Sequence, residues 1–156
     1  MEDLIIFALI QLAVTWALVG SSWYTQIIHY PLYHKIKEGF VEYERAHMRR
    51  VAFFIAPLMI IEVVSAIILV GLSEGRLAIL SVINLVFLIF IWLATFLFQI
   101  TQHQKLTIRF SKKIVQSLIA SNWVRTLLWS GKGAIMAYYF YYFLMHACKL
   151  HLEHIF

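Results

Sequence analysis

Hydrophobic residues are concentrated in four long runs of the chain, separated by shorter polar segments. The runs cover about residues 4–28, 51–72, 77–102 and 123–146. Each is long enough for the ~20 residues with which a helix crosses the hydrocarbon core of a bilayer. None shows the alternation of apolar and polar residues that is typical of membrane barrels. Because lipid offers the backbone no hydrogen bonds, the pattern predicts an all-α integral membrane protein, an antiparallel four-helix bundle with one domain over residues 1–156.

The composition agrees with a membrane protein. Of 156 residues, 62% are hydrophobic and 13% are charged, whereas a soluble domain is nearer half apolar and a quarter charged. The first run opens with Glu2 and Asp3 instead of the basic residues of a signal peptide, so we interpret it as a retained helix. The single cysteine, Cys148, excludes an internal disulfide.

The polar links between the runs are unequal in length and charge. Residues 71–76 form a short turn, whereas residues 28–50 and 103–121 are longer and basic. Positive charge favours the cytoplasmic side, so we expect a bacterial inner-membrane protein with both long links inside and both termini outside. The net charge of +5 then fits anionic lipid headgroups, and we expect no nucleic-acid partner. The basic residues of the two links are Lys35, Lys37, Arg45, Arg49, Arg50, Lys105, Arg109, Lys112 and Lys113.

The two halves of the chain show a sparse internal similarity. The segment "HMRRVAFF" (residues 47–54) opens the second run, and "NWVRTLLW" (residues 122–129) opens the fourth. A histidine ends the preceding run in each half, and a glutamine lies at a similar depth. This pattern indicates two duplicated helix–loop–helix halves related by an axis along the membrane normal, with chance similarity as the alternative. The matching residues are Gln26 and Gln99, and His29 and His103.

Antiparallel helices would bring several metal-ligating side chains into one layer near the cytoplasmic surface. Glu44 and His47 lie three positions apart and therefore share a helix face. Such an E-x-x-H pair supplies half of a di-iron site in soluble bundles, but a second pair is missing here. Imidazoles with a carboxylate suit iron, zinc or copper, and two facing histidines suit a haem. The alternative is a set of hydrated histidines with nothing bound. The predicted ligands are His29, His47, His103 and Glu44.

Glu62 is the most isolated charge of the four runs. It lies fifteen residues beyond His47, which corresponds to about 22 Å along a helix and places it near the bilayer midplane. A carboxylate there usually faces the bundle interior and has a partner. Gln11, Thr15 and Asn84 lie at a similar depth. We expect a catalytic role for Glu62 as a proton carrier or substrate anchor, with a structural hydrogen bond as the alternative.

Arg125 also lies in an apolar context, within "SNWVRTLLW". It is near enough to the interface to extend its charged end towards water. The alternative is a role in the site, where it would bind an anionic lipid headgroup, a substrate carboxylate or a haem propionate. We place Arg125 among the candidate catalytic residues and group it with Asn122, Gln26 and Gln99 as residues that bind a cofactor or substrate.

The motifs "HYPLYHKI", "AHMRR", "QHQKL" and "NWVRTLLW" together resemble a family of small bacterial membrane proteins with four helices and no established activity. The resemblance covers most of the chain and implies the fold but no chemistry. In length and four-span layout alone, the chain is also similar to anthrone-oxygenase-like membrane proteins. That likeness implies oxygen-dependent chemistry on an aromatic substrate, and it does not extend to individual residues.

Three functions remain open from the sequence. The first is a metal- or haem-dependent membrane oxidoreductase that acts on a lipid-soluble or small substrate. The second is a small-solute or proton-linked transporter, which would need a homo-oligomer to provide room for alternating access. The third is a non-catalytic membrane assembly partner. No phosphate-binding loop and no G-x-S-x-G motif occurs, so nucleotide hydrolysis and α/β-hydrolase chemistry have no support.

Overall fold

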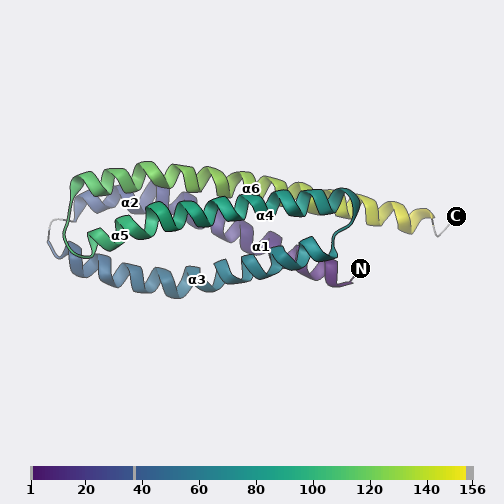
Figure 1. Ribbon diagram of the computed structural model, residues 1–156, viewed down its shortest axis with the longest axis horizontal. Helices are drawn as coiled ribbons and strands as arrows, with labels where there is room; N and C mark the ends of the chain where they lie inside the picture. The colour runs from purple at the N-terminus through teal and green to yellow at the C-terminus, as the bar shows by residue number, and fades with distance from the viewer. Residues whose placement is uncertain (1, 37, 154–156) are drawn as a thin grey trace.

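The computed structural model describes residues 2–36 and 38–153, with side chains up to residue 147 (Figure 1). Every regular element of the described chain is a helix. The first helical segment is continuous but changes its winding towards its end. It comprises α1 (Glu2–Tyr24), the π-helix η1 (Thr25–His29), α2 (Tyr30–Leu32) and the 3₁₀-helix η2 (Tyr33–Lys35).

Three further helical segments follow, so the described chain contains four in all. The second is α3 (Phe40–Leu72), and the fourth is α6 (Lys112–Glu153). The third comprises α4 (Gly75–Ala94), the π-helix η3 (Thr95–Ile100) and α5 (Thr101–Leu106). The predicted short turn lies between α3 and α4. Gly39 and Gly75, with φ of 67° and 55°, provide the left-handed conformations from which α3 and α4 begin.

Three of the four helical segments are long and apolar enough to cross a membrane. They are Glu2–Lys35, Phe40–Leu72 and Gly75–Leu106. α6 is not among them, because it contains many amphipathic tyrosines and tryptophans together with Arg125 and Lys132. The fourth predicted span therefore stays a prediction.

The helical segments lie lengthwise beside one another (Figure 1). α1 packs against α3 and α6, and α4 packs against the same two helices. α3 and α6 therefore occupy diagonal positions. The start of α1, the turn between α3 and α4, and the last part of α6 lie at one end of the molecule, whereas α2 and α5 lie towards the other.

The core is divided into three apolar layers along the helices. The middle layer includes Leu18, Met59, Leu88 and Trp129. A second layer, which includes Tyr33, lies beside α2 and α5. A third layer lies towards the opposite end and includes Ala8, Leu69, Met136 and Tyr139. Polar side chains are buried between these layers, and they define the two clusters described below.

Many large hydrophobic side chains are exposed on the outer surface. Phe53 is 86% exposed, Leu97 64% and Ile79 62%, and they come from different helical segments. Soluble monomers rarely expose large apolar side chains over so much of their surface. The surface is therefore consistent with that of a membrane protein.

The two π-helices lie at corresponding places in the two halves of the chain. The hydroxyl of Thr25 donates to the carbonyl of Ser21, and that of Thr95 donates to the carbonyl of Ile91, each at 2.8 Å. Each threonine opens its π-helix, and its hydroxyl occupies a carbonyl oxygen four residues back. π-helices are rare and often occur at functional sites. Their paired occurrence agrees with the sequence similarity of the two halves.

Candidate functional site

A chain of hydrogen bonds connects α3, α5 and α2 near the ends of the π-helices. Nδ1 of His103 lies 2.5 Å from Oε1 of Glu44, and its Nε2 lies 2.8 Å from the Tyr30 hydroxyl. All three side chains are buried. A carboxylate that holds an imidazole, which in turn contacts a hydroxyl, is the arrangement with which enzymes position proton-transferring groups. We call these three residues the relay.

Two further histidines lie beside the relay. The rings of His29 and His47 are stacked with centroids 4.3 Å apart, and the His47 ring lies 5.9 Å from that of His103. The structure therefore brings the four predicted metal ligands into one layer, with Glu44 as the fourth. We call this group the histidine layer.

The histidine layer does not have the arrangement of a metal site. Within the described residues, no group of three histidine, cysteine, aspartate or glutamate side chains is placed to hold a metal ion. Both ring nitrogens of His103 already take part in hydrogen bonds. However, Nε2 of His29 is buried without a hydrogen-bond partner, and Oε2 of Glu44 has none except the neighbouring hydroxyl of Tyr33. Such orphaned groups are costly and need an explanation.

The predicted cofactor- or substrate-binding residues are held in an amide network between the two π-helices and α6. Nε of Arg125 donates to Oδ1 of Asn122 at 3.0 Å, and Nδ2 of Asn122 donates to Oε1 of Gln26 at 2.8 Å. On the other half, Nε2 of Gln99 donates to the hydroxyl of Ser121 at 3.3 Å. The two glutamines thus anchor corresponding positions of the two halves to α6.

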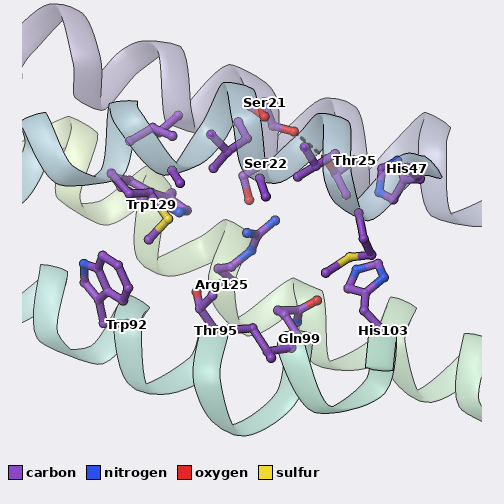
Figure 2. A pocket seen from close by; sticks show the side chains of 18 of the residues that line it. Ser21, Ser22, Thr25, His47, Trp92, Thr95, Gln99, His103, Arg125 and Trp129 are labelled. Atoms are coloured by element: carbon purple, nitrogen blue, oxygen red, sulfur yellow. Dashed lines mark hydrogen bonds between the residues drawn. The ribbon is translucent and has the colours of Figure 1, made fainter. Parts of the chain in front are cut away.

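A cavity of about 260 Å³ lies between these groups. Figure 2 shows His47 and His103 at one end, Trp92 and Trp129 at the other, and Arg125 reaching into the space between them. Most of the remaining wall is apolar. Its residues are Leu18, Ser21, Ser22, Thr25, Tyr30, Met48, Val51, Ala52, Ile55, Ala56, Met59, Thr95, Gln99 and Ile100.

The cavity reaches the outer surface of the molecule beside α3. Val51, Ala52 and Ala56 line it and are also exposed. Two of these three side chains are single methyl groups, so the wall there is thin. A ligand could therefore reach the cavity from the outer surface beside α3.

Glu62 belongs to a second, separate polar cluster in the middle of the molecule. Oε1 of Glu62 lies 2.5 Å from Nζ of Lys132, and both side chains are fully buried. The same oxygen accepts hydrogen bonds from Thr15 at 2.6 Å and Gln11 at 3.0 Å. Asn84 completes the cluster, because its Oδ1 lies 2.5 Å from Nζ of Lys132. We call these five residues the ionic cluster.

The three residues that the sequence placed at the depth of Glu62 therefore all belong to the ionic cluster. Its counter-charge, Lys132, was not predicted. Lys132 comes from α6, diagonally opposite α3, and reaches across the centre of the molecule. The glycines on either side of it permit close packing. A Cβ on Gly131 would lie 2.7 Å from the Phe87 ring, and one on Gly133 would lie 3.1 Å from Val19. A lone lysine between two glycines in an apolar run is a signal that could have identified it.

Tyr30 was also missed as a site residue. It follows Gln26 by four positions, just as His103 follows Gln99. Tyr30 and His103 are separated by 73 residues, as are Gln11 and Asn84. The repeat of the two halves at this spacing pairs Tyr30 with His103. The sequence comparison had instead aligned His29 with His103, which is one position out of this register.

Comparisons with known proteins identify no relative of this chain. No family model matches the chain, and no curated protein or solved structure is significantly similar to it. The function must therefore be inferred from the side chains of the protein itself.

Proposed function

We propose that the protein is an antiparallel bundle of four membrane-spanning helices in a bacterial inner membrane, with both termini outside the cytoplasm. The apolar outer surface and the basic residues near α2, α5 and the start of α6 support this proposal. Lys132 and Arg125 make α6 the least apolar segment, but both extend inwards and not into lipid. Inward-facing charges are the ones that membrane helices tolerate.

We further propose that the protein is an enzyme that binds a small, lipid-soluble molecule in the cavity and performs acid–base chemistry at one of its oxygen atoms. The observation that carries this proposal is the relay, which begins at a buried carboxylate and ends at a hydroxyl in the cavity wall. Tyr30 and His103 both line the cavity. The only other contact of the Tyr30 hydroxyl among the described residues is a long one of 3.5 Å to Gln99.

The direction of proton transfer follows from the hydrogen bonds. When both ring nitrogens of His103 carry a proton, Nδ1–H donates to Glu44 and Nε2–H donates to the oxygen of Tyr30. Tyr30 can then give its own proton to an oxygen of the ligand and take the proton of Nε2 in its place. His103 becomes neutral, with its remaining proton held by Glu44. The reverse sequence removes a proton from a ligand hydroxyl.

The first experiment identifies the ligand. Protein purified into lipid nanodiscs is extracted with organic solvent, and the extract is compared by mass spectrometry with that of Ala56→Phe, which fills the cavity beside α3. We expect a small molecule that co-purifies with the wild type and is lost from Ala56→Phe. Ala13→Phe is the matched control, because Ala13 is exposed and does not line the cavity.

The second experiment tests the chemistry. The extracted molecule is incubated with protein in D₂O, and the deuterium that it gains at carbon atoms next to its oxygen is followed over time, because deuterium on oxygen exchanges without an enzyme. Wild type should promote this exchange, and Tyr30→Phe should do so at least about 100-fold more slowly, as expected for the loss of a general acid or base. Equal rates in Tyr30→Phe would contradict the proposal.

A metal- or haem-dependent oxidoreductase is the second candidate. The buried Nε2 of His29, which has no hydrogen-bond partner, supports it, because a neutral imidazole nitrogen is a metal ligand. The side chains of the histidine layer would have to rearrange to share one ion, since no three of those described are placed to do so. Metal analysis and an absorption spectrum of the purified protein, repeated on His47→Ala, test this candidate. A blank result for the wild type would contradict it.

A further inference from the structure

Arg125 contributes an unusual charge to the wall of the cavity. Among the described residues its guanidinium makes one hydrogen bond, from Nε to Asn122, and no carboxylate lies within salt-bridge distance. This hydrogen bond fixes the position of the guanidinium through its Nε atom. The donors of the two Nη groups remain available on the cavity side (Figure 2).

The two buried acids near this region are already engaged. Glu44 contacts His103, and Glu62 contacts Lys132. The other acidic residues with described side chains are exposed, and they occur near the start of α1, around the start of α3 and in the turn before α4. Arg125 therefore has no internal counter-charge. A cation in an apolar wall is stabilised most by an anion that enters with its apolar part.

The rest of the wall points to the same kind of ligand. The Trp92 ring lines the cavity, but its Nε1 is buried without a hydrogen-bond partner and points away from Arg125 in Figure 2. The guanidinium of Arg125 is a donor only. The oxygen of Thr95 lies nearby, but its hydroxyl already donates to Ile91. The free donors of Arg125 thus complement the oxygens of a carboxylate or a similar anion.

From these contacts we infer that the cavity selects a hydrophobic organic anion, with the charged group at Arg125 and the apolar body against Trp92 and Trp129. The inference rests on the proposed function, since it names the class of molecule that the same cavity binds. A volume of about 260 Å³ exceeds the ~150 Å³ of a cavity that holds benzene. A single ring with a carboxylate and a short alkyl chain fits this size.

The experiment compares two probes that differ in charge. Binding of 4-butylbenzoate and of 4-butylbenzyl alcohol to protein in nanodiscs is measured by equilibrium dialysis, with the signal of protein-free nanodiscs subtracted. We expect the wild type to bind the acid about 10-fold to 100-fold more tightly, the range for a hydrogen bond to a charged group. Arg125→Gln should lose this preference, and Arg125→Lys should keep part of it.

A matched control separates local recognition from net charge. Arg109→Gln removes the same charge from an exposed position that does not line the cavity, and it should keep the full preference. Equal binding of the two probes by the wild type would overturn the inference and leave the proposed ligand site intact. Binding of neither probe would contradict both. The wild-type comparison is decisive even if a variant fails to fold.

Discussion

The ionic cluster and the histidine layer both bury charged groups among apolar helices, but they do so in different ways. In the ionic cluster, one oxygen of Glu62 receives three donors from two other helices, and Lys132 has partners on both sides. Beside the histidine layer, donors of Arg125 face a cavity, and Nε2 of His29 lacks a partner. The ionic cluster pairs its two charges internally, although Oε2 of Glu62 has no hydrogen-bond partner. The charge of Arg125 has no such internal counter-charge among the described residues, and this difference supports the proposed ligand site.

Loss of one member of the ion pair in the ionic cluster should have the largest effect on stability. Glu62→Ala would leave Lys132 buried without a counter-charge, so we expect a loss of about 3–5 kcal/mol in the free energy of unfolding. Unfolding in mixed micelles with increasing denaturing detergent measures the change. The double variant Glu62→Leu with Lys132→Met should recover most of the loss, because it removes both charges together. An unchanged single variant would show that Glu62 is not held as an ion.

A substitution in the relay should lower the rate of catalysis and leave the stability of the protein nearly unchanged. Glu44→Gln keeps the size of the side chain but removes the charge that holds His103, so we expect turnover of the extracted ligand to fall about 100-fold, the lower range for a lost acid–base group. Ligand binding should change little, since Glu44 does not line the cavity. Glu42→Gln is the matched control, because it makes the same change at an exposed position of the same helix. Equal losses in both variants would contradict a role for the relay.

Close packing beside Lys132 predicts a smaller effect. Gly131→Ala would place a Cβ against the Phe87 ring, which must shift, and we expect a loss of about 1 kcal/mol as for mild overpacking. Gly71→Ala should be neutral or stabilising, because nothing lies within 4 Å of its added Cβ. The same detergent unfolding measures both. Greater stability in Gly131→Ala would show that the helices do not need the glycine there.

The smallest effect concerns the aromatic wall of the cavity. Trp92→Phe keeps an aromatic side chain but removes part of the apolar surface that lines the cavity, so we expect binding of both probes to weaken about 3-fold to 10-fold. The acid and the alcohol should be affected equally, because Nε1 of Trp92 is buried away from the cavity. Trp123→Phe is the control, because Trp123 is exposed and does not line the cavity. If the two variants behave alike, Trp92 does not contact the ligand.

The sequence predicted the helical segments well because hydrophobic runs and their polar links are local features. Residues 4–28, 51–72, 77–102 and 123–146 all lie within described helical segments. The long links were expected to extend the helices, and α3 and α6 do begin well before their apolar runs. Depth along a helix is also local, and it correctly placed Gln11, Thr15 and Asn84 near Glu62.

Contacts between side chains of different helices could not be predicted from such local features. Lys132 reaches Glu62 from the diagonal helix, and which helices are diagonal depends on packing and not on depth. The histidines were expected as metal ligands, but the sequence does not specify their rotamers. Two of them stack on each other, and the third forms hydrogen bonds through both nitrogens. The π-helices also could not be predicted, because the 3.6-residue period of hydrophobic residues describes regular α-helices only.

Each π-helix accommodates one more residue in a turn than an α-helix does. Such a turn absorbs an inserted residue locally, whereas the same insertion into a regular α-helix would rotate everything after it by about 100° around the axis. The winding of Thr25–His29 therefore lets the helix before and after it keep its faces, so that Thr15 contacts Glu62 upstream and the phenol of Tyr30 meets its imidazole downstream. One added codon in such a protein could thus open a backbone turn for new chemistry during evolution while its scaffold persists.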